Sequence, residues 1–309
     1  MHSASHSILK VLAYYNIFNY PLTKEEIIVL LDTDYTRTES DEGFQFLLDE
    51  QMIFPVDEFY ALYNNPILAI RRKQGNERAV KQLKTANKVA KLLSWFPYVK
   101  GVAVSGSLSK NFAYEKSDID FFIITAKDRL WLARTFMHLF KKLTFLIGKQ
   151  QWFCMNYYLD ETALEIREKN IFTATEVITA LQLQGNSVFH DFISANEWAK
   201  KFIPHYNLER NEPRNIKKRF LKLVIEWIFN NKAGDKLDNW LMRVTISRWR
   251  KKTERKETNS NGILMGMDAG KHYSKPDPRY FQQKVVHRYD LKMEQLLQEL
   301  ESFPAVRAV

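Results

Sequence analysis

The sequence is poor in three residue types that define whole classes of protein. Its 309 residues include a single cysteine, Cys154, which excludes an intrachain disulfide framework and a zinc site built from cysteines. Ten glycines and nine prolines exclude a collagen-like or low-complexity chain. With 45% hydrophobic and 27% charged residues, the composition is instead that of a globular protein.

Long uncharged hydrophobic runs are also missing. The most apolar stretch, residues 130–148, is interrupted by Arg134, His138, Lys141 and Lys142, so it lacks the ~20 consecutive apolar residues that span a bilayer. The N-terminus has no basic stretch followed by an apolar run, as a secretory signal would. We therefore expect a cytoplasmic protein with no membrane partner.

The net charge of +10 is concentrated in one segment. Residues 214–256 contain 14 Lys and Arg but 4 Asp and Glu, which leaves 32 of the 46 bases and 32 of the 36 acids for the rest of the chain. The start of a predicted helix, where the helix dipole disfavours cations, is crowded by four bases, Lys217, Lys218, Arg219 and Lys222. The segment predicts weak, sequence-independent binding of RNA or another acidic partner. A solvated cationic surface is the alternative, above all at 248–256.

Residues 1–70 have the pattern of a winged-helix-like module. Apolar spacing predicts three short helices, at 7–17, 24–31 and 38–51. Thr23 and Glu26 have the spacing of a capping box at the start of the second helix. A short hairpin is expected at 56–62, with Asp57 and Glu58 at its tip.

The charge of this module argues against DNA binding. Between Thr38 and Ile70 there are seven acids and no Lys or Arg, so the third helix and the hairpin would carry negative charge towards phosphates. We expect the module to pack against the next domain or to contact a protein partner.

Strands and helices alternate in the middle of the chain, and helices dominate after it. A basic helix is predicted at 71–94, followed by three strands at 99–105, 119–125 and 151–159, with a helix at 130–147 between the last two. Further helices are predicted at 172–183, 187–202, 214–231, 234–255 and 279–300. This pattern predicts an α+β fold.

The chemically informative stretch joins a glycine turn to a pair of acids. An apolar strand leads into Gly106 and Ser107, ten residues follow, and then come Asp118 and Asp120 at the start of the next apolar strand. Side chains alternate along a strand, so the two acids would share a face about 6.6 Å apart. Two carboxylates so close repel each other unless a cation lies between them, and hard oxygens favour Mg²⁺. Glycine lets the backbone approach a phosphate.

Together these features resemble the nucleotidyltransferase signature of the DNA polymerase beta superfamily. That signature is an apolar strand, Gly followed by Gly or Ser, about ten residues, and then Asp-apolar-Asp; the resemblance covers roughly residues 77–160. The alternative is an ordinary turn beside a solvated strand edge. The resemblance implies a small mixed sheet at 71–165, placed between the module at 1–70 and a mainly helical domain at 166–309.

The resemblance also implies an activity. Asp118 and Asp120 would hold one or two Mg²⁺ ions, and Gly106 and Ser107 would bind the outer phosphates of a nucleoside triphosphate such as ATP. Two further residues of the turn, Ser109 and Lys110, are candidates for the same phosphates or are simply helix-surface positions. The expected reaction is Mg²⁺-dependent transfer of a nucleoside monophosphate to an acceptor hydroxyl. The acceptor is not identified by any local motif.

One position departs from the family pattern. Family members use a third carboxylate on the following strand, where the aligned residue of this chain is Asn156. Asp160 has the same parity but lies about 13 Å further along the strand. Asparagine cannot serve as a base. A nucleotide-binding sensor or regulatory protein with weak or absent turnover is therefore the alternative to an active enzyme.

Two further features of the sequence each have two interpretations. Glu176 either faces the site or is an ordinary acid in the first turn of a helix, and the second interpretation is preferred. The glycine-rich and proline-rich loop at 259–278 either folds over a bound substrate or is an interdomain linker.

Overall fold

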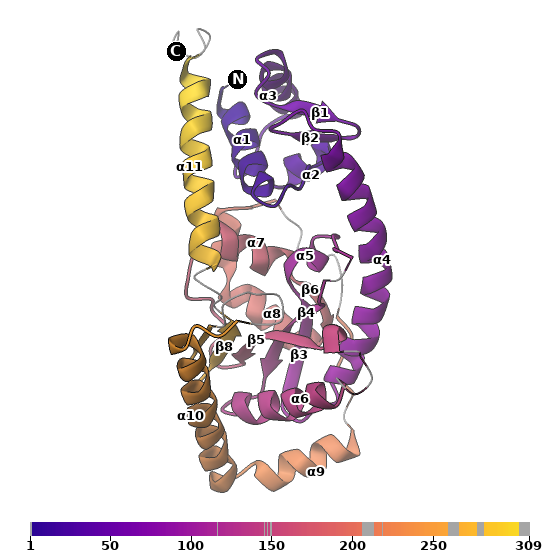
Figure 1. Ribbon diagram of the computed structural model, residues 1–309, viewed down its shortest axis with the longest axis vertical. Coiled ribbons are helices and arrows are strands. Elements are labelled where there is room, and N and C mark those ends of the chain that lie inside the picture. Colours follow the sequence, from indigo (N-terminus) through magenta and orange to yellow (C-terminus); the bar gives the residue numbers. More distant parts are fainter. Residues whose placement is uncertain are drawn as a thin grey trace.

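The computed structural model of the chain describes residues 2–115, 117–144, 146, 148, 150–205, 213–217, 219–258, 266–276 and 281–302 (Figure 1). Lys218 of the predicted basic segment and residues 259–265, 277 and 278 of the predicted loop lie outside the described residues.

The N-terminal part consists of three helices and a hairpin, as the sequence predicts. Its elements are α1 (His2–Asn16), α2 (Lys24–Val29), α3 (Arg37–Asp49), β1 (Phe54–Val56) and β2 (Phe59–Ala61). The predicted capping box is present, because the Glu26 amide donates to Thr23 Oγ1 and the Thr23 amide donates to the Glu26 carboxylate. Asp57 takes a left-handed conformation at the hairpin tip, with φ 62°. This is a winged-helix-like arrangement.

A long helix, α4 (Ile67–Leu93), runs from this module along the side of the sheet (Figure 1). Arg72 fixes the module to the helix: it is buried, pairs with Glu26 at 2.6 Å, and lies over the Tyr20 ring at 3.8 Å. At the other end of α4, small and aliphatic residues such as Ala86 and Leu93 pack on the sheet.

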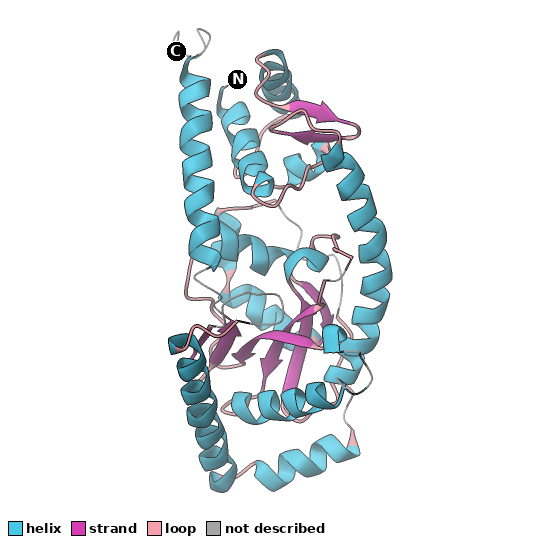
Figure 2. Ribbon diagram, in the orientation of Figure 1, coloured by secondary structure: helices cyan, strands magenta, loops and turns pink. Residues whose placement is uncertain are grey.

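The central sheet is mixed and has six strands. They are β3 (Val99–Val104), β4 (Asp120–Thr125), β5 (Cys154–Asp160), β6 (Leu181–Gln184), β7 (Met267–Ala269) and β8 (Tyr273–Pro276), in the order β6-β3-β4-β5-β8-β7. Strands β4 and β5 are parallel, and the other neighbours are antiparallel. The α+β fold with a small mixed sheet is thus confirmed (Figure 2).

Three of these strands were not predicted. The helix expected at 172–183 ends at Thr179, and β6 follows it; the loop expected at 259–278 contributes β7 and β8 to the sheet edge. All three strands have only three or four residues, too few for a period of two to be recognised. These three strands come after residue 165 in the chain and yet join the central sheet. The division of the chain at residues 70 and 165 stays a prediction.

Helices cover both faces of the sheet. The remaining elements are α5 (Gly106–Ser109), α6 (Leu130–Thr144), η2 (Gln150–Trp152), α7 (Ile171–Thr179), α8 (Asn186–Ala195), η3 (Glu197–Lys201), α9 (Phe220–Phe229), α10 (Lys232–Glu254) and α11 (Phe281–Ser302). Strand alternation sends Phe121 and Ile123 towards α4 and α6, and Phe122 and Ile124 towards α7 and α8. The hydrophobic core on the α7 and α8 side of the sheet continues into the N-terminal module and α11. These parts therefore pack as one body. No helix in the described part of the chain is both long and apolar enough to cross a membrane.

Candidate active site

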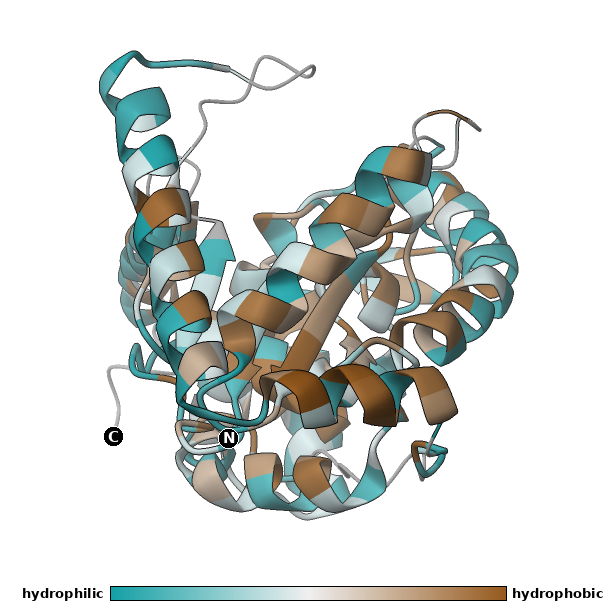
Figure 3. Cartoon of the chain, turned by 90° about the horizontal axis from the view of Figure 1, so that it is seen from below, coloured by the Kyte–Doolittle hydropathy of each residue, from teal (hydrophilic) through white to brown (hydrophobic). Residues whose placement is uncertain are grey.

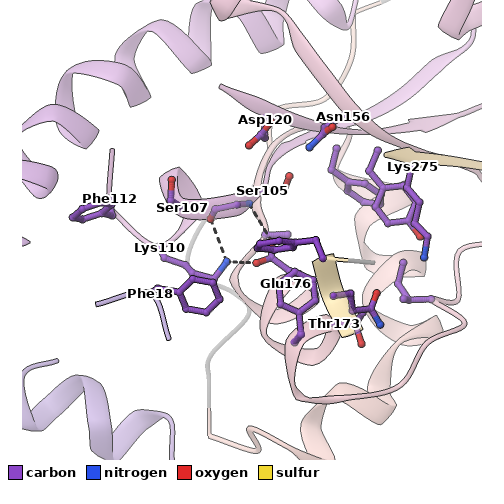
Figure 4. A pocket seen from close by; sticks show the side chains of 18 of the residues that line it. Phe18, Ser105, Ser107, Lys110, Phe112, Asp120, Asn156, Thr173, Glu176 and Lys275 are labelled. Atoms are coloured by element: carbon purple, nitrogen blue, oxygen red, sulfur yellow. Dashed lines mark hydrogen bonds and ion pairs between the residues drawn. The ribbon is translucent and has the colours of Figure 1, made fainter. Parts of the chain in front are cut away.

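A cavity of about 500 Å³ lies where the N-terminal module meets the sheet. Its walls come from α1, the turn after β3, the starts of β4 and β5, and α7 (Figure 4). Ten aromatic residues line it: Tyr14, Tyr15, Phe18, Tyr20, Phe112, Tyr114, Phe122, Tyr157, Phe172 and Phe281. Its charged lining residues are Lys110, Asp120, Glu168, Glu176 and Lys275. The cavity therefore combines ring surfaces with a small, mixed set of charges.

The turn at Gly106 follows directly on the pairing of β3 with β4. The Ser105 amide donates to the Asp120 carbonyl at 2.9 Å, which continues the pairing of β3 with β4. Gly106 follows with φ 68°, in the left-handed region that favours glycine. A Cβ at this position would lie 3.1 Å from Asp120 Oδ2, so a side chain would also crowd the carboxylate. Gly106 is thus required by both the backbone and its neighbour.

The residues predicted to bind phosphate differ in their placement. Gly106, Ser107 and Lys110 line the cavity (Figure 4). Ser109 is not among the lining residues; its hydroxyl donates to the Gly106 carbonyl at 2.8 Å and so closes the turn. Lys110 Nζ donates to the same carbonyl at 3.2 Å.

The two acids of the predicted pair also differ. Asp120 opens β4 and lines the cavity, whereas Asp118 precedes the strand, is exposed, and is not among the lining residues. Loss of solvent raises the pKa of Asp120 to about 6, and the negative charges of Asp118 and Glu176 act in the same direction. Asp120 is therefore a desolvated carboxylate near two other negative charges. A bound cation would reduce the electrostatic repulsion among them.

Asn156 lies beside Asp120 because Cys154 pairs with Asp120 and Asn156, two residues further along β5, shares its face. A bulge in β5 also begins at this point. Phe121 pairs with Met155 but Phe122 pairs with Tyr157, so Asn156 is an extra residue between two paired positions. Its side chain lines the cavity next to Asp120 (Figure 4).

Asp160, the other acid of this strand, has a different environment. It is fully buried at the far end of β5 and does not line the cavity. Its carboxylate accepts hydrogen bonds from the Asp128 amide at 2.6 Å and from the Thr162 amide at 2.8 Å. Asp160 thus anchors the loops that follow β4 and β5.

Glu176 faces the cavity, so the preferred interpretation of it as a first-turn acid is wrong. It is the sixth residue of α7, and its carboxylate accepts the Gly106 amide at 3.1 Å and Lys110 Nζ at 2.6 Å (Figure 4). These are two of the groups predicted to hold phosphate. No local motif marks Glu176, because its partners lie 66 and 70 residues earlier in the chain.

The described part of the predicted loop contributes one residue, Lys275, to the cavity wall. Residues 266–276 form β7 and β8, and Lys275 of β8 lines the cavity and pairs with Glu168 at 2.6 Å. This pair closes the end of the cavity that lies away from the glycine turn.

The oxygen donors at the glycine turn suit a hard cation. Asp120 and Asn156 offer a carboxylate and an amide oxygen on the cavity wall, and Asp118 and Glu176 add negative charge around Asp120. Mg²⁺ prefers such oxygen ligands. The residues present therefore fit a divalent cation.

A second cluster of possible metal ligands is less suited to hold a cation. Among the described residues, ligand atoms of Asp128, Asp160 and His272 lie within 4.8 Å of one another. However, Asp160 already accepts two backbone amides, and Lys271 pairs with Asp128 at 2.7 Å. We interpret this cluster as a hydrogen-bonded loop anchor.

Comparison with known proteins agrees with this geometry. Residues 86–181 match the model of a protein family described as the nucleotidyltransferase domain. No curated protein and no solved structure matches the chain. The matched range includes the glycine turn, Asp118, Asp120, Asn156 and Glu176. The chain therefore contains a nucleotidyltransferase domain, in agreement with the resemblance of its glycine turn and acids to the DNA polymerase beta superfamily.

Proposed function

We propose that the protein is a Mg²⁺-dependent nucleotidyltransferase that moves a nucleoside monophosphate from a nucleoside triphosphate to an acceptor hydroxyl. The observation that carries this proposal is the meeting of the Gly106 turn and the Asp120 carboxylate on one wall of an aromatic cavity. The turn supports a role in phosphate binding, the carboxylate supports a role in cation binding, and the aromatic walls support stacking of a base.

Electrostatics support the cation. A desolvated Asp120 next to Asp118 and Glu176 is costly to ionise, as its raised pKa indicates. A Mg²⁺ ion held by Asp118 and Asp120 would offset that cost and bring phosphate oxygens into its shell. When bound, the metal would stabilise charge on the attacking and leaving oxygens.

The contacts of Glu176 suggest how phosphate enters. In the structure its carboxylate accepts hydrogen bonds from the Gly106 amide and the Lys110 ammonium. Phosphate oxygens make the same kind of charge-assisted hydrogen bond. On triphosphate binding, the phosphates would take over both donors, and Glu176 would be free to face Asp120 and the acceptor.

The reaction then follows from this placement. The acceptor oxygen bonds to the α-phosphorus, the bond from that phosphorus to the pyrophosphate oxygen breaks, and a base takes the hydroxyl proton. Asn156 cannot be that base. Among the charged residues that line the cavity, Glu176 is a carboxylate released by phosphate binding, so we assign it this role.

A second function is favoured by Asn156 itself. If Glu176 stays bound to Lys110, the site holds a triphosphate without a base, and the protein is a nucleotide-binding sensor with weak or absent turnover. The two functions share the binding site and differ in whether pyrophosphate is released.

A pyrophosphate-release screen distinguishes them. The four ribonucleoside triphosphates are each incubated with Mg²⁺ and with small-molecule, protein or RNA acceptors. An enzyme releases pyrophosphate with one combination, and Asp120→Asn abolishes the release. The matched control is Asp191→Asn, which removes an exposed acid on α8 outside the cavity and should leave the rate unchanged. Triphosphate binding without release in any combination would favour the sensor.

A further inference from the structure

Helix α9 turns its apolar face to the solvent and its polar face to the protein. Of its ten residues, all of them described, Lys222 alone is buried. Phe220, Leu221 and Trp227 are 84%, 69% and 80% exposed. Seen from below, α9 lies at the front of the view, and most of its ribbon has hydrophobic colours (Figure 3). An ordinary surface helix turns its apolar stripe inward.

Hydrogen bonds hold the polar face of α9 inward. Lys222 Nζ donates to the carbonyls of Ser94 at 3.2 Å and Val99 at 2.7 Å. One turn later, the Glu226 carboxylate accepts the Tyr98 amide at 2.6 Å. Rolling the helix to bury its apolar side would leave these groups without partners, which is costly. The outward orientation of the apolar face is therefore fixed by the fold.

We propose that the outward face of α9 binds an anionic lipid surface. Trp, Phe and Leu on one face with Lys and Arg at its borders are the composition of interfacial helices. Lys217 and Arg219 precede the apolar residues and Lys232 and Lys236 follow them, and all four are exposed. Negative headgroups would pair with these bases, while the apolar side chains enter the boundary with the acyl chains.

Charge decides between the occupants of this face. A second copy of the chain would bring a second segment with 14 Lys and Arg against the first, and like charges repel. RNA would satisfy the charges, and its bases would stack on Phe220 and Trp227, but it offers little to the exposed aliphatic side chains of α9, which are Leu221, Leu223 and Ile228. An anionic lipid surface complements both the bases and the apolar face.

This proposal departs from the expectation that the protein has no membrane partner. That expectation rests on spanning segments and signals, and a helix that lies in the interface needs neither. No residue of α9 lines the nucleotide cavity, so lipid binding at α9 leaves that site accessible.

Vesicle co-sedimentation of the full chain tests the proposal. The chain should bind vesicles of phosphatidylcholine with phosphatidylglycerol and show little binding to phosphatidylcholine alone. Phe220→Ser with Trp227→Ser should lower the partition coefficient at least about tenfold, because two exposed side chains no longer enter the lipid. The matched control, Ile67→Ser with Ile70→Ser, removes exposed apolar residues from α4 and should change nothing.

A second variant tests the charges separately. Lys232→Glu with Lys236→Glu should weaken binding to the anionic vesicles and leave the circular dichroism spectrum unchanged. The proposal is overturned if the chain ignores anionic vesicles, or if the apolar variant binds them as the wild type does. It is also overturned if the wild type is a dimer that the apolar variant converts to a monomer, or if that variant loses RNA binding instead.

Discussion

At the scale of single residues, Gly106 offers a sharp test of the phosphate turn. Gly106→Ala should lower triphosphate affinity at least about tenfold, because alanine is strained at φ 68° and its Cβ would crowd Asp120 Oδ2. Gly148→Ala is the matched control: Gly148 has φ 65°, but a Cβ there meets no atom within 4 Å. Calorimetric titration of both variants with a triphosphate separates the effect of backbone strain from the effect of a change at the phosphate site. Equal affinities would mean that phosphate binds elsewhere.

Asp120 predicts how stability changes with pH. Its pKa is raised from 3.8 to about 6, so the folded state binds the proton more tightly than the unfolded state does. The ionised side chain therefore destabilises the metal-free protein above pH 6, and the penalty fades as the pH falls towards 4. Asp120→Asn should raise the free energy of unfolding at pH 8 by up to about 3 kcal/mol and change it little at pH 4. Denaturant unfolding at both pH values measures this, and a destabilised variant at pH 8 would contradict it.

The assignment of the base gives a second pair of variants. Glu176→Gln should slow pyrophosphate release by about 10²–10⁴-fold, the usual loss when a general base is removed. Asn156→Asp should raise the rate, because it adds a carboxylate beside Asp120. Glu168→Gln is the matched control, since Glu168 lines the same cavity but pairs with Lys275 away from the turn. A rate unaffected by Glu176→Gln, or lowered by Asn156→Asp, would refute the assignment.

These residues also show what the sequence can and cannot predict about the site. The glycine turn and Asp120 stand in one short stretch, and their chemistry follows from spacing. Asn156 lines the cavity next to Asp120, as alternation along the strand predicts, whereas the bulge at this position has no signature in the sequence. For Glu176 the sequence favours the wrong one of two interpretations, because this residue reaches the turn from a helix whose position depends on the whole sheet.

At the scale of elements, the sequence predicts best what is local. The capping box at Thr23 and the hairpin tip at Asp57 are set by neighbouring residues, and both are present. The short strands β6 and β8 pair with β3 and β5, which are distant in the chain, and β7 joins the sheet only through β8, so their sequences alone do not mark them.

The contact between α4 and the N-terminal module yields an element-scale prediction. Arg72→Ala should lower the free energy of unfolding by about 2 kcal/mol, because it removes a buried guanidinium that pairs with Glu26 and stacks on Tyr20. Triphosphate affinity should also fall, since Tyr20 lines the cavity. The control is the neighbouring Lys73→Ala, whose ion pair with Asp57 is exposed and contributes little. Similar stability of the two variants would contradict this role of Arg72.

At the scale of the whole molecule, the parts of the chain converge on one cavity. The N-terminal module supplies aromatic rings, the nucleotidyltransferase domain supplies the glycine turn and Asp120, and the C-terminal part supplies Lys275 and Phe281. The apolar α9 and the basic α10 lie at the other end of the molecule from the module (Figure 1). We infer that the module serves the active site through the rings of Tyr14, Tyr15, Phe18 and Tyr20.

The most direct test of the account is calorimetric titration of the full chain with a nucleoside triphosphate, in Mg²⁺ and in a chelator. The account predicts affinity at least about tenfold higher with Mg²⁺, because the cation relieves the repulsion around Asp120. It also predicts that Asp118→Asn or Asp120→Asn removes this gain and that Asp191→Asn keeps it. Equal affinity with Mg²⁺ and with chelator in the wild-type protein would contradict the proposed site.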